Sequence, residues 1–558
     1  MLTRYKRFKD PIYGYIKIEG SIVKNVIDMP EFQRLRDVIQ TSYVPLYSSA
    51  LHNRFAHSLG VYHLGKIASH ALEQSFVRNE SLQEGQKKLK DYIQIFELAC
   101  LLHDVGHAPF SHTGEKFYLQ SDSRRQLHEE LSSLVKDRKI LKEEISKNSY
   151  NAAPHELMSA ILALNVFKKE IPAQQRSFFA RCITGYKYTE QMNEDKSLKN
   201  CFIELLNSKV IDVDKLDYLM RDSYMSGFDT VRIDYFRLLD SICVDKNENG
   251  YYEMFFHKAA VSILENVVYA HDAERKWLQN HPVVLYEANL IEKSMEAIIK
   301  TILHDKKFNS ILLSQEGLEV DGFGRIRLMG DSDILYLMKN LEDQSVSEEY
   351  YNRNKRKHPI WKTEEEFQAI FTGKQKELEI IENLFVKLRD FLRSTGLPFV
   401  INEEALNIAR SERNKLQNEK EELKKAGEQE YASEIRRIDL SLKDNQNILE
   451  LISIFDKFRK EQKINFDFLV IYTKQFISGF RKQEFGNIEL RFPELKNLCR
   501  FGDISNVLKG SESKAEKFFF LYCTQKENKN GQKTIEIMPL IDKMLSLATR
   551  LDTASRLR

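Results

Sequence analysis

The stretch at residues 101–112 constrains the fold more than any other part of this sequence. It reads Leu-Leu-His-Asp-Val-Gly-His-Ala-Pro-Phe-Ser-His, so an apolar run ends in the adjacent pair His103 and Asp104. His103 and His107 are four residues apart and would share one face of a helix. Imidazole nitrogens and carboxylate oxygens are the ligands expected for Zn, Fe or Mn. The pattern therefore predicts a helix over residues 92–106 that carries metal-binding side chains.

Two other stretches supply candidate partners for this pair. His57 lies in the string His-Asn-Arg-Phe-Ala-His-Ser-Leu-Gly at 52–60, and Asp214 lies in Asp-Val-Asp-Lys-Leu-Asp-Tyr at 212–218. In this order and with these neighbours, the residues resemble the HD phosphohydrolase superfamily, specifically the deoxynucleoside triphosphate triphosphohydrolases. The resemblance implies that His57, His103, Asp104 and Asp214 hold one metal ion. The alternative, that they are satisfied polar groups of a core, fits a single histidine better than the joint pattern.

The implied ligand set limits the choice of metal. Two neutral and two anionic ligands leave positions open on an octahedral ion, which favours Fe or Mn over a closed tetrahedral zinc site, although Zn remains an option. Such an ion can activate water and polarise a phosphoryl oxygen. The resemblance also implies Mg²⁺ bound to the outer phosphates of the substrate.

Further residues take catalytic roles by the same resemblance. His112 would protonate the departing nucleoside oxygen, oriented by Glu115 and His155, while His107 would contact the α-phosphate. The family usually has Asp where this chain has Glu115, which keeps the charge and changes the reach. His128 also precedes a glutamate and is the second choice for the supporting histidine.

The segment 204–226 is predicted to be one helix with a polar stripe. Asp214, Tyr218 and Asp222 recur every four residues and so lie on one face. An acid, an aromatic ring and an acid suit the wall of a pocket: a metal ligand, a platform for a sugar, and an acceptor for its hydroxyl. Lys215 and Arg54 would hold phosphates as fixed cations.

Other substrate contacts are implied only by the resemblance. Gln40 would read the sugar 3′-hydroxyl, and Arg275 the terminal phosphate, with a register that leaves Lys276 as the alternative. The tyrosine that the family places at the ribose 2′ edge falls at Val284, with Tyr286 two residues further on. The choice between deoxynucleotides and ribonucleotides therefore stays open.

The N-terminal region resembles an activating nucleotide site of the family. Lys6, Asp28, Gln33 and Arg36 match positions that hold a guanine nucleotide in animal members, while Tyr13 stands where a histidine is usual. The resemblance implies a homo-oligomer, a dimer, a tetramer or a larger assembly, that the nucleotide promotes. The alternative is a helix start after Pro30 with an exposed charged face. A second basic run at 353–357 is either a solvated face or an allosteric phosphate clamp.

The expected fold is mainly α. It comprises an HD-type helical catalytic core at 1–345, a connecting helical region at 346–402, a charged helical hairpin at 403–462 and a small α+β lobe at 463–558. Residues 403–462 contain almost no turn residues and are rich in Lys and Glu, with Ile435, Ile438, Leu442, Leu449 and Ile452 on the apolar side. Within the core, strands are expected around the turn at 247–250, and a long helix at 260–303 is expected to break near Pro282.

Composition excludes several classes of protein. The chain has 558 residues, 84 basic and 82 acidic, for a net charge of +2, so charge gives no reason to expect nucleic-acid or membrane binding. The six cysteines form no Cys-x-x-Cys pair. The N-terminus lacks a signal-peptide apolar region, and no run of apolar residues is long enough for a membrane helix, so we expect a cytoplasmic protein.

The resemblance implies that the chain cleaves a dNTP to a deoxynucleoside and tripolyphosphate, activated by a nucleotide. By analogy it implies a role in bacteriophage defence through dNTP depletion. Two alternatives are another HD phosphohydrolase, acting on a nucleoside monophosphate or a signalling nucleotide, and a non-catalytic nucleotide-sensing or nucleic-acid-binding scaffold. Tyr218, Asp222, Lys215 and Arg54 favour a triphosphate, and the full ligand set with His112 disfavours a scaffold.

Overall fold

The computed structural model describes residues 5–556 except 42–45, 79–85, 120–122, 148–151, 209, 229–231, 305–308, 396–399, 463–467, 473–484, 496, 510–518 and 524–535. The chain forms two compact units. The first comprises residues 1–280, 287–348 and 477–514, and the second comprises 281–286, 349–476 and 515–558. Each unit is described by itself.

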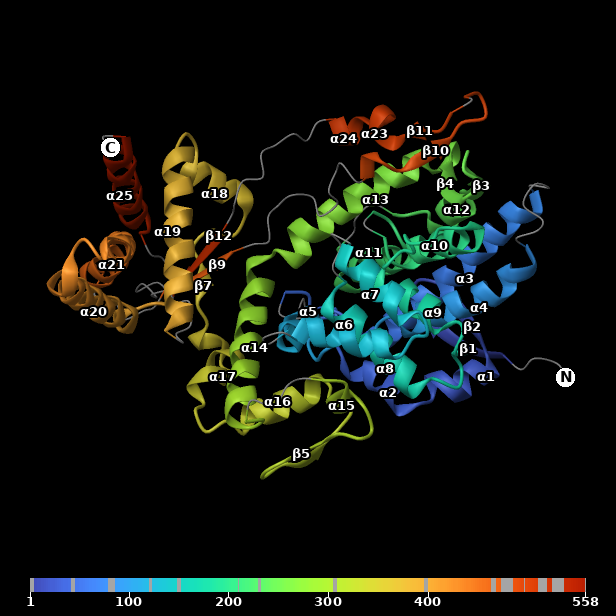
Figure 1. Cartoon of the computed structure of the whole chain (residues 1–558), viewed down its shortest axis with the longest axis horizontal. Helices are drawn as coiled ribbons and strands as arrows, with labels where there is room; N and C mark the ends of the chain where they lie inside the picture. The colour runs from blue at the N-terminus through green and yellow to red at the C-terminus, as the bar shows by residue number, and fades with distance from the viewer. Residues whose placement is uncertain are drawn as a thin grey trace. The chain divides into compact units, whose positions relative to one another are not determined.

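The first unit is built mainly of helices (Figure 1). In chain order they are α1 (Gly20–Ile22), η1 (Val23–Ile27), α2 (Pro30–Gln33), η2 (Arg34–Asp37), α3 (Arg54–Arg78), α4 (Gln86–Leu102), α5 (His112–Glu115), η4 (Lys116–Leu119), α6 (Ser123–Ser133), α7 (Arg138–Lys147), α8 (Pro154–Val166), α9 (Arg176–Thr184), α10 (Glu194–Leu206), α11 (Val213–Ser226), α12 (Tyr235–Asp240), η5 (Lys258–Ala260), α13 (Val261–Glu274), η6 (Arg275–Gln279), α15 (Ser310–Leu313), α16 (Asp331–Lys339), α23 (Phe501–Ile504) and α24 (Asn506–Lys509). The helices α14 (Pro282–Thr301) and α17 (Ser345–Tyr351) contain residues of both units. The long helix α3 packs against α4 and α11, so it can present side chains to both.

Three small sheets complete the first unit. The antiparallel hairpin of β1 (Tyr5–Asp10) and β2 (Gly14–Glu19) pairs Asp10 with Gly14, and β5 (Leu318–Val320) pairs with β6 (Gly324–Ile326). A four-stranded sheet has the order β11-β10-β4-β3, formed by β3 (Ile242–Lys246), β4 (Tyr252–His257), β10 (Glu489–Arg491) and β11 (Cys499–Arg500). The strand β10 pairs with β4 in parallel, so a strand from the C-terminal part of the chain joins a sheet that begins near residue 242.

The second unit combines a helical bundle with a sheet. Its helices are η7 (Arg353–Lys355), α18 (Glu364–Phe371), α19 (Gln375–Ser394), α20 (Glu403–Gly427), α21 (Ala432–Glu461) and α25 (Met538–Arg556). Its sheet has the order β7-β12-β9-β8, from β7 (His358–Pro359), β8 (Val400–Ile401), β9 (Phe468–Tyr472) and β12 (Phe519–Cys523). Trp361 is fully buried at the sheet and donates its Nε1–H to the carbonyl of Phe519, so the indole is both packed and satisfied.

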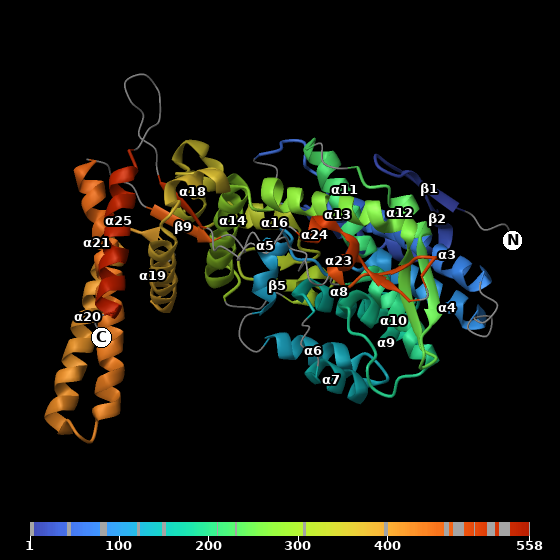
Figure 2. The same ribbon diagram turned by 90° about the horizontal axis from the view of Figure 1, so that it is seen from above.

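The predicted helical class is confirmed, and the charged hairpin at 403–462 is present. Figure 2 shows α20 and α21 as two long helices that lie antiparallel beside α25. Of the predicted apolar side, Ile435, Ile438 and Ile452 are buried, and Leu442 and Leu449 are half-buried. The strands around the turn at 247–250 and the helix break before Pro282 are also present.

One predicted helix ends earlier than expected, and a second is broken into two. The helix α4 stops at Leu102, so His103 and His107 lie in the turns that follow and do not share a helical face. At Gly106, in the turns after the helix, a Cβ would lie 2.4 Å from the backbone carbonyl carbon of Met158, and such close approach of two segments requires glycine. The predicted helix 204–226 is broken between α10 and α11, because Asp212 caps α11 by accepting from Lys215 N.

The structure divides the C-terminal region differently from the predicted lobe at 463–558. The strands β10 and β11 belong to the first unit, whereas β9, β12 and α25 belong to the second. Among the residues that are described, no helix has the length and apolar character required to cross a membrane.

Candidate metal centre and adjoining histidine cluster

The structure brings together the four predicted metal ligands. His57 comes from the first turn of α3, His103 and Asp104 follow α4, and Asp214 lies in the first turn of α11. His57 Nε2 lies 3.0 Å from Asp214 Oδ1 and 3.2 Å from His103 Nε2, and His103 Nε2 lies 3.6 Å from Asp214 Oδ1. Asp104 approaches each imidazole to 3.5 Å, with Oδ2 toward His57 and Oδ1 toward His103.

These side chains fit a cation. Donor atoms held roughly 2.1 Å from one ion lie about 3 Å from one another, as they do here. His103 Nδ1 lies 2.9 Å from the carbonyl oxygen of Cys100, and that acceptor requires a proton on Nδ1 and leaves the Nε2 lone pair for a ligand bond. Nitrogen and carboxylate donors in this spacing could hold a metal ion, with His57 and His103 buried and Asp214 half-buried.

The electrostatics of the centre favour a bound cation. Burial alone would lower the pKa of His57, but hydrogen bonds to Asp214 and Asp217 raise this pKa to about 9. Burial would raise the pKa of Asp214, yet the hydrogen bonds and charges of His103 and His57 hold it well below its usual range. The carboxylates of Asp104 and Asp214 therefore stabilise positive charge between them, which a divalent ion supplies.

Buried side chains hold the turns that carry the ligands. Arg34 is 4% exposed and donates to the carbonyls of Val105 and His107, and Gly106 N donates to Ser159 Oγ. Phe110 and Ser111 have φ angles of 55° and 53°, a backbone region that non-glycine residues rarely adopt. A strained turn held on several sides fixes the positions of the side chains within it.

A second cluster adjoins the ligands. Glu115 Oε1 lies 2.6 Å from His112 Nδ1, 2.7 Å from His155 Nδ1 and 3.4 Å from His107 Nε2. The rings of His107 and His155 stack, with centroids 4.4 Å apart. His128 bonds the hydroxyl of Tyr186 instead, so His155 is the histidine that joins the cluster.

Protonation states in this cluster follow from its contacts. Burial would lower the pKa of His155, but Glu115 raises it to about 9, and burial with the nearby Arg54 lowers the pKa of His107 well below its usual range. The four side chains also have a spacing that could hold an ion. Contacts of 2.6 and 2.7 Å to one oxygen are hydrogen-bonding distances, so we interpret the cluster as a proton relay from His155 through Glu115 to His112. The His112 side chain is 70% exposed, and it can therefore reach a substrate.

The two cations predicted to hold phosphates, Arg54 and Lys215, both bind groups of the protein in this structure. Arg54 donates to Asp104 Oδ2 at 2.7 Å and to Ser111 Oγ, so it anchors a metal ligand. Lys215 Nζ donates to Asp212 Oδ2 and to the carbonyl of Ser208, and its side chain is 22% exposed.

Asp222 does not form the outer end of a pocket stripe. It is 1% exposed, and its Oδ1 lies 2.6 Å from Nε2 of the equally buried His52. A helical period places residues on one face but does not show which part of that face packs against another segment.

The other predicted substrate residues are Gln40 and Arg275, with Tyr286 near the position expected at the ribose. Gln40 is 4% exposed, and its side-chain oxygen, like Thr41 Oγ1, has no hydrogen-bond partner among the described residues. Burial lowers the pKa of His271, and the positive charges of Arg275 and Lys215 lower it further. Both cations therefore lie near this histidine. Tyr286 donates to Glu349 within the second unit, which occupies its hydroxyl.

The predicted effector residues are partly engaged with one another. Lys6 Nζ lies 3.9 Å from Asp28 Oδ1, and both side chains are more than half exposed. Gln33 donates to the carbonyl of Ile27 and accepts from Arg36 Nε, while Arg36 stacks 3.6 Å above the ring of Phe55.

The alternative clamp at 353–357 is weakened by the contacts of two of its members. Arg356 donates to the carbonyls of Glu349 and Tyr350, and Lys357 pairs with Glu349.

Sequence reasoning missed the residues behind His57. Asp217 accepts from Arg221 and lies 2.7 Å from His57 Nδ1, and Tyr13 donates its hydroxyl to Asp217. The signal was present in the chain, because Asp217 follows Asp214 by three residues, and Asp217 and Arg221 are spaced as a helical ion pair.

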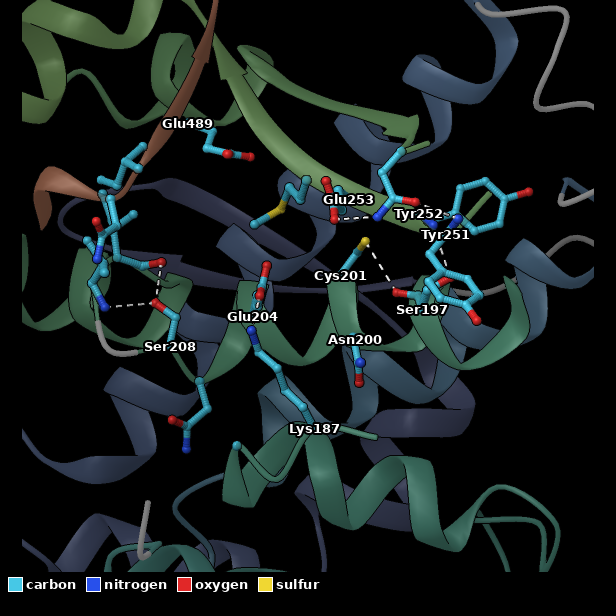
Figure 3. Close-up of a pocket in the computed structure, with 18 of the residues that line it drawn as sticks. Lys187, Ser197, Asn200, Cys201, Glu204, Ser208, Tyr251, Tyr252, Glu253 and Glu489 are labelled. Atoms are coloured by element: carbon cyan, nitrogen blue, oxygen red, sulfur yellow. Dashed lines mark hydrogen bonds and ion pairs between the residues drawn. The ribbon is translucent and has the colours of Figure 1, made fainter. Parts of the chain in front are cut away.

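A separate cavity of about 840 Å³ lies between α10, β4 and β10 (Figure 3). Glu204, Glu253 and Glu489 line it, with Lys187 as a basic neighbour. Three carboxylates against one ammonium group disfavour a triphosphate there. Its wall includes Ser208, whose carbonyl holds Lys215, so this cavity borders the candidate centre without being its substrate pocket.

Comparisons with known proteins agree with this site. The sequence pattern of the HD domain family matches residues 54–200, which contain His57, His103 and Asp104. An uncharacterised protein of Mycoplasma genitalium is 26% identical over 336 residues, which are 55% of this chain and 68% of that protein. The deoxynucleoside triphosphate triphosphohydrolase SAMHD1 of Homo sapiens is 32% identical over 271 residues, which are 45% of this chain and 40% of the human protein. A solved structure of a hypothetical protein from Aquifex aeolicus covers 98% of this chain and 100% of that one, at 18% identity and a TM-score of 0.49.

Residues 54–200 thus match the HD domain family, and the chain is similar to deoxynucleoside triphosphate triphosphohydrolases over 45–48% of its length. The match spans less than half of the human relative's length and about half of that of an uncharacterised Mycoplasma pneumoniae relative.

Proposed function

We propose that this protein is a metal-dependent hydrolase that cleaves a deoxynucleoside triphosphate to a deoxynucleoside and tripolyphosphate. The observation that carries the proposal is that two clusters of polar side chains adjoin each other. A donor set spaced for one ion, His57, His103 and Asp214 with Asp104, adjoins a His–Glu relay that ends at the exposed His112. Cleaving a phosphate ester requires an activated water and a proton donor for the leaving oxygen, and the two clusters can supply one each.

A bound Fe or Mn ion, with Zn as an option, would lower the pKa of water and withdraw charge from a phosphoryl oxygen. The chain's own residues hold the ligands in place for it. Arg54 binds Asp104 Oδ2, and the carbonyl of Cys100 binds His103 Nδ1, so neither ligand can turn without losing a buried contact.

His112 is the residue suited to protonate the nucleoside 5′ oxygen. Glu115 contacts its Nδ1, so the opposite nitrogen can donate to a leaving group. The charged His155 on the other side of Glu115 balances the carboxylate, which limits the cost of burying it.

Neutral and cationic groups near the centre suit a phosphate chain. Within the described part of the chain, neither ring nitrogen of His107 makes a hydrogen bond, although Nε2 lies 3.4 Å from Glu115 Oε1. The lowered pKa of this ring keeps it neutral, with one N–H to donate to an α-phosphate oxygen. Lys215 and Arg275, which both lower the pKa of His271, supply charge for the outer phosphates, with Mg²⁺ bridging these in solution.

The sugar end is supported by Gln40. Its buried side-chain oxygen has no partner among the residues that the structure describes, and leaving such a group unpaired costs free energy that a ligand hydroxyl can recover. The backbone oxygen of the same residue accepts from Arg54 at 3.3 Å, so a sugar bound to Gln40 would lie beside the anchor of Asp104.

Products of all four dNTPs and all four NTPs, each alone and in pairs, provide the test of this function. Inorganic tripolyphosphate and a deoxynucleoside in equal amounts are expected from at least one dNTP. A nucleoside monophosphate with diphosphate would refute attack at the α-phosphorus with departure of the nucleoside. Turnover of signalling nucleotides or monophosphates alone would favour another HD phosphohydrolase.

We further propose that a second nucleotide raises this activity by binding near Lys6, Asp28, Gln33 and Arg36 in a homo-oligomer. The exposed carboxylate of Asp28 and the ammonium group of Lys6 can pair with a base edge and a phosphate. Such an activator must bind the active assembly more tightly than the inactive one. Depletion of dNTPs would starve DNA replication, which is the basis for a role in bacteriophage defence.

A further inference from the structure

The environment of His57 suggests how the metal centre is fixed from behind. We propose that Asp217 and Tyr13 are positioning residues of this centre, which hold the His57 ring so that its Nε2 lone pair faces the ion and thereby set the affinity for metal. The inference rests on the metal centre of the proposed function and not on its substrate.

The Asp217 carboxylate is saturated with donors. Its Oδ2 accepts from Arg221 Nε at 2.8 Å and lies 2.7 Å from His57 Nδ1. Its Oδ1 accepts from Arg221 Nη2 at 2.9 Å and from the Tyr13 hydroxyl at 2.7 Å. A carboxylate paired in this bidentate way with arginine is ionised and can only accept.

This arrangement determines which nitrogen of His57 carries the proton. Because Asp217 Oδ2 offers no proton, His57 must donate from Nδ1, so in the neutral ring that binds a metal the lone pair is on Nε2. The Nε2 atom is the one that lies 3.0 Å from Asp214 and 3.2 Å from His103. A carboxylate behind a ligating histidine fixes both the tautomer and the orientation of the ring.

Tyr13 reaches Asp217 from a distant part of the chain. It lies in the turn between β1 and β2, where Asp10 Oδ1 accepts from the backbone nitrogens of Ile12 and Tyr13. The second oxygen of Asp10 accepts from Arg221 Nη1 at 3.0 Å, so the turn and the arginine share one anchor. The β1–β2 hairpin is therefore a part of the support of the metal centre, and Tyr13 is its contact.

The close packing of α3 on α11 confines the side chains of Asp217 and Arg221. A Cβ at Gly60, three residues after His57, would lie 1.9 Å from Asp217 Oδ1 and 2.5 Å from Arg221 Nη2. Asp217 and Arg221 are 0% and 1% exposed. A carboxylate confined in this way can transmit the loss of a single donor to the imidazole it holds.

The test measures the dissociation constant for Mn²⁺ in the full-length protein, by competition with a chelator and without nucleotide. Asp217→Asn should weaken binding about 10–100-fold, the effect typical of losing the partner of a ligating histidine. Tyr13→Phe should weaken it about twofold to tenfold, the scale of one hydrogen bond. Tyr15→Phe, on the same hairpin and 61% exposed, is the matched control and should not change it.

A double variant and the melting temperature separate positioning from a structural role. With Asp217→Asn present, adding Tyr13→Phe should weaken Mn²⁺ binding by less than it does alone, because both act through one carboxylate. Tyr13→Phe carries the test if Asp217→Asn does not fold.

Variants that melt lower but bind Mn²⁺ as tightly as the native protein would overturn the inference and leave the proposed function standing. A native protein that binds no Mn²⁺ would overturn both. Weakened binding in a protein that hydrolyses no nucleotide would support the positioning roles and refute only the proposed reaction.

Discussion

Glu115→Gln is the substitution that tests the proposed relay most fully. Burial would lower the pKa of His155, but Glu115, with smaller contributions from Glu156 and Asp104, raises it from 6.5 to about 9. At about 1.4 kcal/mol per pKa unit, that net shift corresponds to roughly 3 kcal/mol in favour of the charged ring. An amide keeps the shape of the side chain and removes its charge, so the variant should lose most of this stabilisation.

The sign of the pH dependence follows from the direction of the shift. His155 has a higher pKa in the folded protein than in the unfolded chain, so its contribution is fully present below pH 6.5 and is lost as pH rises through about 9. Glu115 has a lowered pKa, and its own contribution remains present throughout this window. Glu115→Gln should therefore destabilise the protein by a few kcal/mol at pH 6 and by clearly less at pH 9.5.

Denaturant unfolding of native and Glu115→Gln protein, both saturated with metal, at pH 6 and pH 9.5 measures this difference. Saturation with metal removes the titration of His57 from the comparison. Equal destabilisation at the two pH values would show that His155 is not charged beside Glu115. The proposed relay, which requires a charged His155, would then be refuted.

Three further outcomes follow from the site. Asp214→Ala should remove bound Fe or Mn and all turnover from a protein that still folds, and full metal occupancy by elemental analysis would disprove the ligand assignment. His112→Ala should keep its metal and lose roughly 10²–10⁴-fold in rate, whereas His70→Ala, an exposed histidine of α3, should match the native enzyme; equal rates in both variants would exclude His112 as the acid. Asp28→Ala combined with Arg36→Ala should abolish activation by a second nucleotide and leave metal content unchanged, and a variant that is still activated would restrict these residues to a charged helix start.

The sequence was informative where a motif determines chemistry. His57, His103, Asp104 and Asp214 were predicted as one ligand set, and their atoms lie within 3.0–3.6 Å of a partner in the set. Motif order and neighbours carry that information because the same residue types must meet wherever one ion is bound.

The sequence was less informative where packing decides. Asp222 has the right helical period for a pocket wall, but the partner that buries it, His52, lies 170 residues away. The contact of Asp217 with His57 spans 160 residues, so the local spacing of Asp217 with Asp214 and Arg221 could mark the residue but could not show its partner. The strand β10 has three residues and pairs with β4 far earlier in the chain, a contact that local pattern alone does not show.

The most direct test of the central claim is hydrolysis of a dNTP in water enriched in ¹⁸O, with mass spectrometry of both products. Attack of water on the α-phosphorus places the label in tripolyphosphate and leaves the deoxynucleoside unlabelled. Label in the deoxynucleoside, or in a diphosphate released with a nucleoside monophosphate, would contradict the proposed reaction.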